Sequence, residues 1–197
     1  HLREIAAFFY QSREIPRVAL YTENCLEGAC SDLACLMFDI FIAPLSPHFK
    51  RDTIHGIFSE LKINIVLADT PERIAMLEEI GRMSDEPILV ISLQALTAEM
   101  TGVPNITEVS KTISSAEMEK LLHYRRRRPV QEVATTMFTS GSTGLPKGVS
   151  FSIYNIITKR FARAAALPTV GGEIFLSYLP LYHTFGRYLE MMGAIYW

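Results

Sequence analysis

The sequence lacks an excess of either charge. Its 197 residues contain 19 Lys and Arg against 21 Asp and Glu, which gives a formal net charge of −2 at pH 7. A chain so balanced has no overall field that would attract nucleic acid or an anionic membrane. Nucleic acid is therefore not expected as a partner, and any site for an anion must be local.

Long apolar runs are also lacking. The longest, LACLMFDIFIAPL at 33–45, has thirteen residues and contains Asp39, whereas a helix that spans a bilayer needs about 20. No transmembrane segment is predicted, although peripheral contact with a membrane stays open. A hydrophobic content of 49% with 20% charged residues is typical of a globular protein with at least one sizeable core.

Cysteine is scarce. The three cysteines, Cys25, Cys30 and Cys35, are five residues apart, so that on a helix each would be turned by about 140° from the last. This spacing suits neither a zinc site nor a shared disulfide. No metal site is predicted, and free thiols favour a reducing compartment, for which we expect the cytoplasm. The chain begins at His1 within an apparent amphipathic helix, HLREIAAFFY, so we expect residues to precede it, and a targeting signal cannot be judged.

Short apolar runs alternate with segments of helical periodicity. Several of these runs are continuously apolar, as strands buried on both faces must be. The pattern predicts the α/β class, with a mainly parallel sheet and helices on both faces. The expected strands are 17–23, 40–47, 63–69 and 87–93, and the expected helices are 26–39, 51–61 and 71–81, the last capped by Thr70, opened by Pro71 and stopped by Gly81.

The later sequence is less regular. Residues 94–114 show no sustained period and predict an irregular connection, followed by a helix at 115–124. The four arginines at 125–128 are interpreted as a solvated surface segment, with a phosphate or nucleic-acid patch as the alternative. Pro129 suggests a division into a first α/β subdomain, 1–130, and the start of a second, 131–197. In the second we expect strands at 134–138, 148–152 and 173–180 and helices at 154–166 and from about Phe185.

The stretch TSGSTGLPKG, residues 139–148, lies between two of these strands. In a glycine-permitted turn, backbone N–H groups can converge on an anion, hydroxyl groups can add hydrogen bonds, and a lysine adds a point charge. A polyphosphate could use all three. Kinase-type P-loops place glycine directly before the lysine, where Pro146 stands here, and Gly141 and Gly144 do not fit the dinucleotide pattern. A structural Gly/Ser hairpin remains the alternative.

FTSGSTGLPKGV resembles the phosphate-binding signature of the adenylate-forming (AMP-binding) superfamily, which includes acyl-CoA synthetases, firefly luciferases and the adenylation domains of nonribosomal peptide synthetases. Every defined position of that signature is filled here. LPLYHTFG, residues 179–186, is similar to the family's second motif, Pro-x-x-His-x-x-Gly. The segment SYLPLYHTFGRYLEMMGAIYW, with Arg187, is most like the long-chain fatty acyl-CoA synthetases.

This resemblance implies a large N-terminal domain of the acyl-CoA synthetase/luciferase-like fold and a two-step reaction. A carboxylic acid, expected to be a fatty acid, reacts with ATP in the presence of Mg²⁺, and the acyl group of the adenylate passes to coenzyme A. Lys147 and His183 are the implied catalytic residues, and Tyr182, His183 and Phe185 are implied to line the junction of the nucleotide and acyl pockets. The implied phosphate-binding residues are Thr139, Ser140, Gly141, Ser142, Thr143, Gly144 and Lys147.

The family's adenine- and magnesium-binding motif, its ribose-binding aspartate and the lysine of its small C-terminal domain follow the histidine motif and do not occur before Trp197. We therefore expect a fragment of the large domain that is inactive alone, with most Mg²⁺ ligands elsewhere. Three alternatives stay open: an enzyme that loads a carrier protein, one that oxidises the adenylate as luciferase does, and a non-catalytic nucleotide-binding module.

Overall fold

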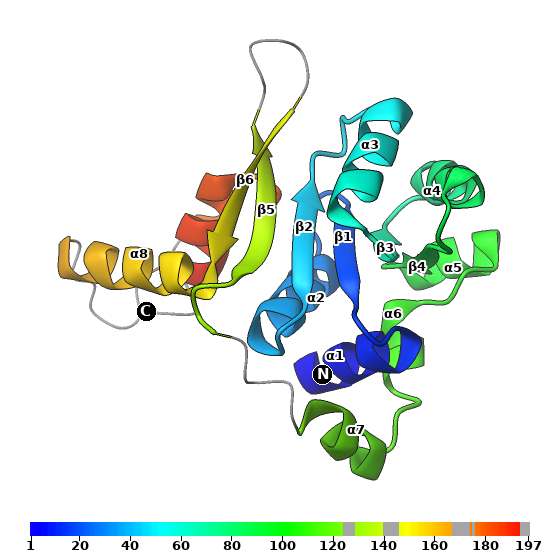
Figure 1. The fold of residues 1–197 in the computed structure, drawn as a ribbon, viewed down its shortest axis with the longest axis horizontal. Helices are drawn as coiled ribbons and strands as arrows, with labels where there is room; N and C mark the ends of the chain where they lie inside the picture. Colours follow the sequence, from blue (N-terminus) through cyan, green and yellow to red (C-terminus); the bar gives the residue numbers. More distant parts are fainter. Residues whose placement is uncertain (124–128, 140–145, 167–173, 175, 194–197) are drawn as a thin grey trace.

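A six-stranded sheet forms the centre of the fold in the computed structural model, which describes residues 1–123, 129–139, 146–166, 174 and 176–193. The strands lie in the order β4-β3-β1-β2-β5-β6, and only the β5–β6 pair is antiparallel (Figure 1). The predicted α/β class with a mainly parallel sheet is therefore confirmed. The strands are β1 (Arg17–Tyr21), β2 (Phe41–Leu45), β3 (Ile65–Ala68), β4 (Leu89–Ser92), β5 (Val133–Thr139) and β6 (Lys147–Ser152).

Helices cover both faces of the first four strands. Because successive strand side chains point to opposite faces, Val18 and Leu20 enter one core while Ala19 and Tyr21 enter the other. The core with Val18 is built against α1 (Leu2–Ser12), α2 (Leu26–Met37), α6 (Ile106–Ser110) and α7 (Ser115–Leu122). The opposite core is built against α3 (Arg51–Leu61) and α4 (Pro71–Met83).

Local signals account for where α4 begins. Thr70 adopts an extended conformation and its hydroxyl accepts a hydrogen bond from the Arg73 N–H at 3.3 Å. Pro71 occupies the first turn, where no intrahelical partner for an N–H is needed. The predicted stop at Gly81 is wrong, since the helix continues to Met83 and the Ser84 N–H closes it on the Gly81 carbonyl. Gly81 instead lies where a Cβ would meet Ile88 at an ordinary 3.7 Å.

Residues 94–114 are more ordered than expected. They form α5 (Ala95–Thr101) and α6, two helices too short to produce a sustained period. Gly102 ends α5 in the left-handed conformation with φ of 73°, which glycine adopts at little cost. The Asn105 side chain caps α6 through the N–H groups of Thr107 and Glu108, and its amide nitrogen also bonds the Ser92 carbonyl of β4.

The later part of the chain packs on the β5–β6 side of the sheet. Met137 of β5 and Ile156 of α8 (Ile153–Ala166) share a core with Tyr188 and Met192, and α8 lies beside the hairpin in Figure 1. A helix begins near Phe185 as predicted, but Gly186–Met191 is wound as a π-helix, labelled η1. The predicted strand at 173–180 is wrong for the described residues 174 and 176–180, which form no ladder.

Ile42 of β2 pairs with Thr135 of β5, so one sheet contains strands from both sides of residue 130. The two-subdomain division at that residue stays a prediction. The arginines at 125–128 lie outside the described residues.

Candidate functional site

Thr139 and Lys147 form the root of the glycine-rich loop. They are the last residue of β5 and the first of β6, and they pair directly across the hairpin. The Thr139 hydroxyl donates to the Lys147 carbonyl at 3.4 Å, and both residues are exposed. The Lys147 side chain is therefore open to solvent where β6 begins. The other predicted phosphate-binding residues, Ser140, Gly141, Ser142, Thr143 and Gly144, lie outside the described residues.

Gly148 has a packing reason to be glycine. A Cβ at this position would lie 3.0 Å from Thr136 Cγ2 and 3.3 Å from Phe138 Cε1. The neighbouring hydroxyls of Thr136 and Ser150 share a hydrogen bond of 2.9 Å across the hairpin. A side chain at the last glycine of the motif would therefore have to displace those of Thr136 and Phe138 on β5.

The histidine motif forms a tight turn that leads into η1. The His183 N–H donates to the Pro180 carbonyl at 3.0 Å, and the Arg187 N–H donates to the His183 carbonyl at 3.0 Å. A Cβ on Gly186 would lie 2.3 Å from the Pro180 oxygen. The spacing Pro-x-x-His-x-x-Gly thus encodes a turn in which the backbone at the glycine lies against the backbone at the proline.

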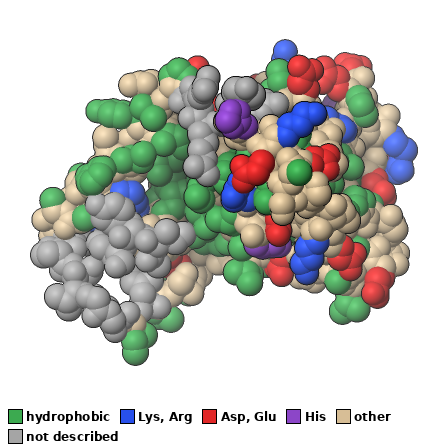
Figure 2. All heavy atoms as spheres, turned by 90° about the horizontal axis from the view of Figure 1, so that it is seen from below, with side chains coloured by type: hydrophobic (Ala, Val, Ile, Leu, Met, Phe, Trp, Pro, Cys, Tyr) green, Lys and Arg blue, Asp and Glu red, His purple; other side chains and the backbone are tan. Residues whose placement is uncertain are grey.

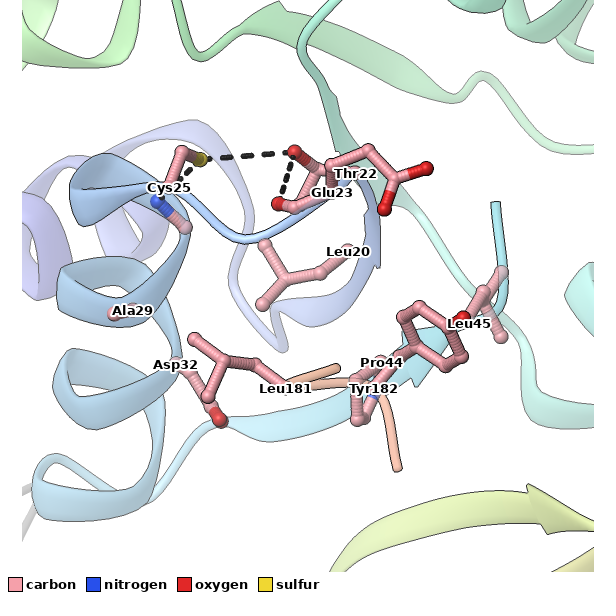
Figure 3. Close-up of a pocket in the computed structure, with 11 residues that line it drawn as sticks. Leu20, Thr22, Glu23, Cys25, Ala29, Asp32, Pro44, Leu45, Leu181 and Tyr182 are labelled. Atoms are coloured by element: carbon pink, nitrogen blue, oxygen red, sulfur yellow. Dashed lines mark hydrogen bonds between the residues drawn. The ribbon is translucent and has the colours of Figure 1, made fainter. Parts of the chain in front are cut away.

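The three predicted pocket residues of this turn do not face one cavity. His183 is exposed and its ring stacks on Phe185, with centroids 6.0 Å apart and planes at 9°. Phe185 lines a groove beside α8. Tyr182 lines a separate hollow between Leu20, Pro44 and Asp32, drawn in Figure 3. That hollow, of about 20 Å³, has room for about one water molecule.

Asn24 attaches the motif to the sheet. Its side-chain amide donates to the Leu179 carbonyl at 2.9 Å, and its side-chain oxygen accepts from the Leu181 N–H at 2.8 Å. Asn24 lies just beyond the carboxyl end of β1. The motif therefore crosses the edge at which β1 and β2 end, as Figure 3 shows for Leu181 and Tyr182.

The loop root belongs to this same edge, because β5 runs parallel to β2 and ends at Thr139. Open α/β sheets bind ligands outside the carboxyl ends of their strands. Thr184, next to His183, also reaches β5, its hydroxyl lying 4.0 Å from Met137 Sδ. Two motifs some forty residues apart in sequence therefore lie at one edge of the sheet.

Arg187 is the residue of this region whose importance the sequence did not reveal. Its side chain is fully buried, and its Nε and Nη2 donate to the two oxygens of Asp32 at 2.7 and 2.5 Å. Burial alone would lower the pKa of Arg187, but the Asp32 carboxylate outweighs burial and raises it, so the guanidinium stays charged. A usable signal was present, since Arg187 directly follows the histidine motif and Asp32 is the one charged residue between Glu27 and Asp39.

A groove of about 440 Å³ lies between α8 and the helix that follows His183, a volume within the usual range for small-molecule sites. Its apolar lining comes mainly from Phe151, Ile156, Phe185, Tyr188 and Leu189, with Lys159, Arg160 and Arg163 on the α8 side. In Figure 2 apolar side chains form much of the described surface on the α8 side, whereas charged side chains are scattered over the opposite side.

No metal site is found within 1–123, 129–139, 146–166 and 176–193, where no three His, Cys, Asp or Glu side chains lie close enough together to hold an ion. Among the same residues, no helix is long and apolar enough to cross a membrane. All three cysteines carry free thiols, with Cys35 buried and the other two half-buried.

Comparison with known proteins agrees with these motifs. Long-chain-fatty-acid–CoA ligase 1 of Cavia porcellus is 27% identical over 186 residues, which cover 88% of this chain and 26% of the ligase. Long-chain-fatty-acid–CoA ligase FadD15 of Mycobacterium bovis is 25% identical, with 89% and 29% covered. The chain thus spans about a quarter of the length of these curated relatives.

Solved structures show the same fold. ATP-bound MatB from Rhodopseudomonas palustris superposes with a TM-score of 0.77 at 19% identity, covering 99% of this chain and 37% of that one. The o-succinylbenzoate CoA synthetase MenE from Bacillus subtilis, in complex with its acyl-adenylate intermediate, gives 0.72 at 18% identity, covering 99% and 36%. A family model described as AMP-binding enzyme matches residues 2–197. The chain belongs to the AMP-binding enzyme family of adenylate-forming ligases.

Proposed function

We propose that this chain supplies the triphosphate-binding edge of an ATP-dependent ligase that converts a fatty acid to its acyl-CoA thioester. The observation that carries the proposal is the position of Lys147 and the histidine motif at one edge of the sheet, both within a chain of the AMP-binding family. The names of the relatives, which are long-chain-fatty-acid–CoA ligases, support the acid and the thiol acceptor.

In the first step a carboxylate oxygen attacks the α-phosphorus of ATP, and the bond from that phosphorus to the bridging oxygen of pyrophosphate breaks. Negative charge then grows on the departing pyrophosphate. Lys147, exposed at the loop root beside Thr139, is suited to stabilise this charge together with the hydroxyl and N–H groups of the loop. No proton needs to leave a serine or threonine in this step.

In the second step the thiol of coenzyme A attacks the acyl carbonyl, and AMP leaves with the electron pair of the broken acyl–phosphate bond. The apolar groove supports an acyl substrate with a hydrocarbon chain, since its lining includes Thr184 and Phe185, the two residues that follow His183. We assign His183 and Phe185 to the junction of the two substrates, and not Tyr182, which lines the separate hollow. Mg²⁺ is expected to accompany ATP, and we assign it no ligand in the described part of the chain.

The test uses the intact protein and measures exchange of labelled pyrophosphate into ATP, with and without a carboxylic acid. Lys147→Ala is expected to lower the acid-dependent exchange rate by about 100- to 1000-fold, the range known for removal of one preorganised donor. Lys111→Ala, at an exposed lysine beside α6, is the matched control and should exchange at the wild-type rate. Exchange by Lys147→Ala within a few-fold of wild type would exclude the role proposed for this lysine.

A series of acids from two to eighteen carbons, followed by assay of the thioester, tests the substrates. We expect long saturated acids to give the highest exchange rates and coenzyme A to receive the acyl group. Acid-dependent exchange without acyl-CoA formation would exclude coenzyme A as the acceptor and leave the first step standing. Absence of exchange with every acid would exclude the catalytic proposal. A cytoplasmic location belongs to the same proposal, supported only by the free thiols.

A further inference from the structure

Arg187 is the largest fully buried side chain among the described residues. Besides its two hydrogen bonds to Asp32 of α2, its Nη1 donates to the Thr135 hydroxyl at 2.7 Å. The Thr135 hydroxyl in turn donates to the Ile42 carbonyl of β2 at 2.6 Å. One guanidinium therefore connects α2, β5 and, through Thr135, β2 to the helix that carries it.

The same residue is one helical turn beyond His183. The Arg187 N–H bonds the His183 carbonyl, and Gly186 lies against the Pro180 carbonyl, so the turn and the buried side chain form one stiff unit. At its other end the guanidinium contacts Thr135, four residues before Thr139 on β5. A short series of contacts, from His183 through Arg187 to Thr135, therefore links the histidine turn to the strand that ends at Thr139.

Stability alone does not account for such a pair. A buried ion pair is often no more stabilising than apolar side chains of similar volume, because both ions lose their hydration. A guanidinium also fixes an orientation. Two of its N–H groups bond a carboxylate in one plane, and a further N–H donor remains for Thr135. A lysine at this position would carry the charge without that orientation.

We propose that Arg187 is a positioning residue that holds the His183 turn in register with β5, and so with the phosphate loop, through Asp32 and Thr135. The inference rests on the proposed function, because that function names the reaction in which the position of His183 matters. The position of His183 relative to β5 is a property of the fold and can be measured without catalysis. Arg187 contacts no reacting atom and acts through the turn on which His183 stands.

The decisive variant is the pair Arg187→Met with Asp32→Leu in the intact protein. It removes both charges together, so no unpaired ion is left buried, and leucine keeps the branched shape of the aspartate side chain. We expect its urea midpoint of unfolding to equal or exceed that of Arg187→Met alone. We expect kcat for acyl-adenylate formation to fall by about 100-fold, as small misplacements of reacting groups can cause, while KM for ATP changes by less than three-fold.

Arg187→Lys tests the hydrogen-bond geometry of the guanidinium separately from its charge. We expect its kcat to fall about as far as that of the double variant, because a lysine cannot bond both Asp32 oxygens and Thr135 in one orientation. Arg3→Met is the control, since Arg3 also forms an ion pair with a carboxylate, that of Glu119, but between α1 and α7. It should leave kcat unchanged.

Wild-type kcat in the double variant, or full activity in Arg187→Lys, would overturn the inference and leave Arg187 a packing residue. If the wild-type protein forms no adenylate, the proposed function fails but the inference is still decided by NMR. The backbone amide signals of His183 and Lys147 should both shift in Arg187→Lys and stay in place in Arg3→Met. Unmoved signals at either residue in Arg187→Lys would overturn the register that we infer.

Discussion

A Cβ atom on Gly186 would lie 2.3 Å from the carbonyl oxygen of Pro180 and 2.7 Å from that of Leu179. No rotation of a side chain can relieve a contact with backbone atoms, so any larger residue must open the turn that carries His183. The glycine of the motif is therefore required by the backbone approach at the end of the turn.

Gly186→Ala should lower the free energy of unfolding by about 1–3 kcal/mol, the usual cost of forcing a methyl group into a tightly packed site. Urea unfolding of the intact protein measures it. The matched control is Gly56→Ala in α3, where a Cβ would meet nothing within 4 Å. That change should stabilise the helix by up to about 1 kcal/mol. Equal stability of Gly186→Ala and wild type would contradict the close contact.

Gly148→Ala should also destabilise the protein. Here a second substitution can remove the side-chain atom that the added methyl group would contact. The nearest atom to the added methyl is Thr136 Cγ2 at 3.0 Å, which Thr136→Ser deletes while it keeps the hydroxyl that meets Ser150. In a double-mutant cycle measured by urea unfolding, we expect the two changes together to cost less than the sum of the single costs, by about 0.5–1 kcal/mol. If the costs of the two single changes simply add, the methyl group that Gly148→Ala introduces is not crowded by Thr136.

Glu190 holds the extended segment before the histidine motif. Its buried carboxylate accepts from the Ser177 hydroxyl at 2.7 Å and from the Leu179 N–H at 3.0 Å. Glu190→Gln weakens both bonds and should cost about 1–3 kcal/mol. It should also raise the amide hydrogen-exchange rate of Leu179. Glu99→Gln, at an exposed position on α5, is the control and should change neither quantity.

The stability of the protein should fall with rising pH above pH 9. Burial, and after it the Asp32 carboxylate, raises the pKa of the Cys35 thiol well above its ordinary value of 9.0, against the opposing charge of Arg187. The unfolded chain therefore releases this proton at a pH where the folded protein keeps it. The stabilisation is complete below pH 9 and is lost as pH rises, by up to about 1.4 kcal/mol per pH unit.

Urea unfolding between pH 8 and 10 measures this slope. Cys35→Ala should be less stable at every pH because it removes buried volume. Its free energy of unfolding should nevertheless fall less steeply with pH, because it lacks this one titrating proton. Burial also raises the pKa of Cys30, which is only half-buried, so Cys30→Ala should flatten the slope less. Identical slopes in wild type and Cys35→Ala would show that this thiol is not the group responsible. Burial also raises the pKa values of Tyr21 and Tyr188 above the ordinary 10.0, so their share of the slope grows only near the upper end of this range.

The sequence predicted those parts of the fold that depend on neighbouring residues. Thr70 and Pro71 open α4 because a cap and a first turn need only a few residues. The two cores follow from continuous apolar runs, which require cover on both faces of a sheet. The glycine-rich loop and the histidine turn were recognisable for the same reason, since each is a short contiguous pattern.

The pairing of Arg187 with Asp32 could not be predicted in this way, because the two residues are 155 positions apart and meet only after the sheet has formed. The segment at 173–180 looked like a strand from its apolar residues, yet its described residues are held by the Glu190 carboxylate and by Asn24 instead of a neighbouring strand. The two short helices in 94–114 could not be predicted from hydrophobic periodicity, because that pattern is detectable only over several helical turns.

The sheet order has a consequence for how the chain folds. Strands β1 to β4 pair with partners close by in sequence and β5 with β6 forms a local hairpin, whereas the Thr135 hydroxyl reaches an Ile42 carbonyl 93 residues earlier. Because distant contacts must first overcome the entropy of closing a long loop, we expect the hairpin to dock onto β2 late. During synthesis Asp32 leaves the ribosome long before Arg187, so we expect its carboxylate to stay hydrated until Arg187 has been made and the two charges are buried together.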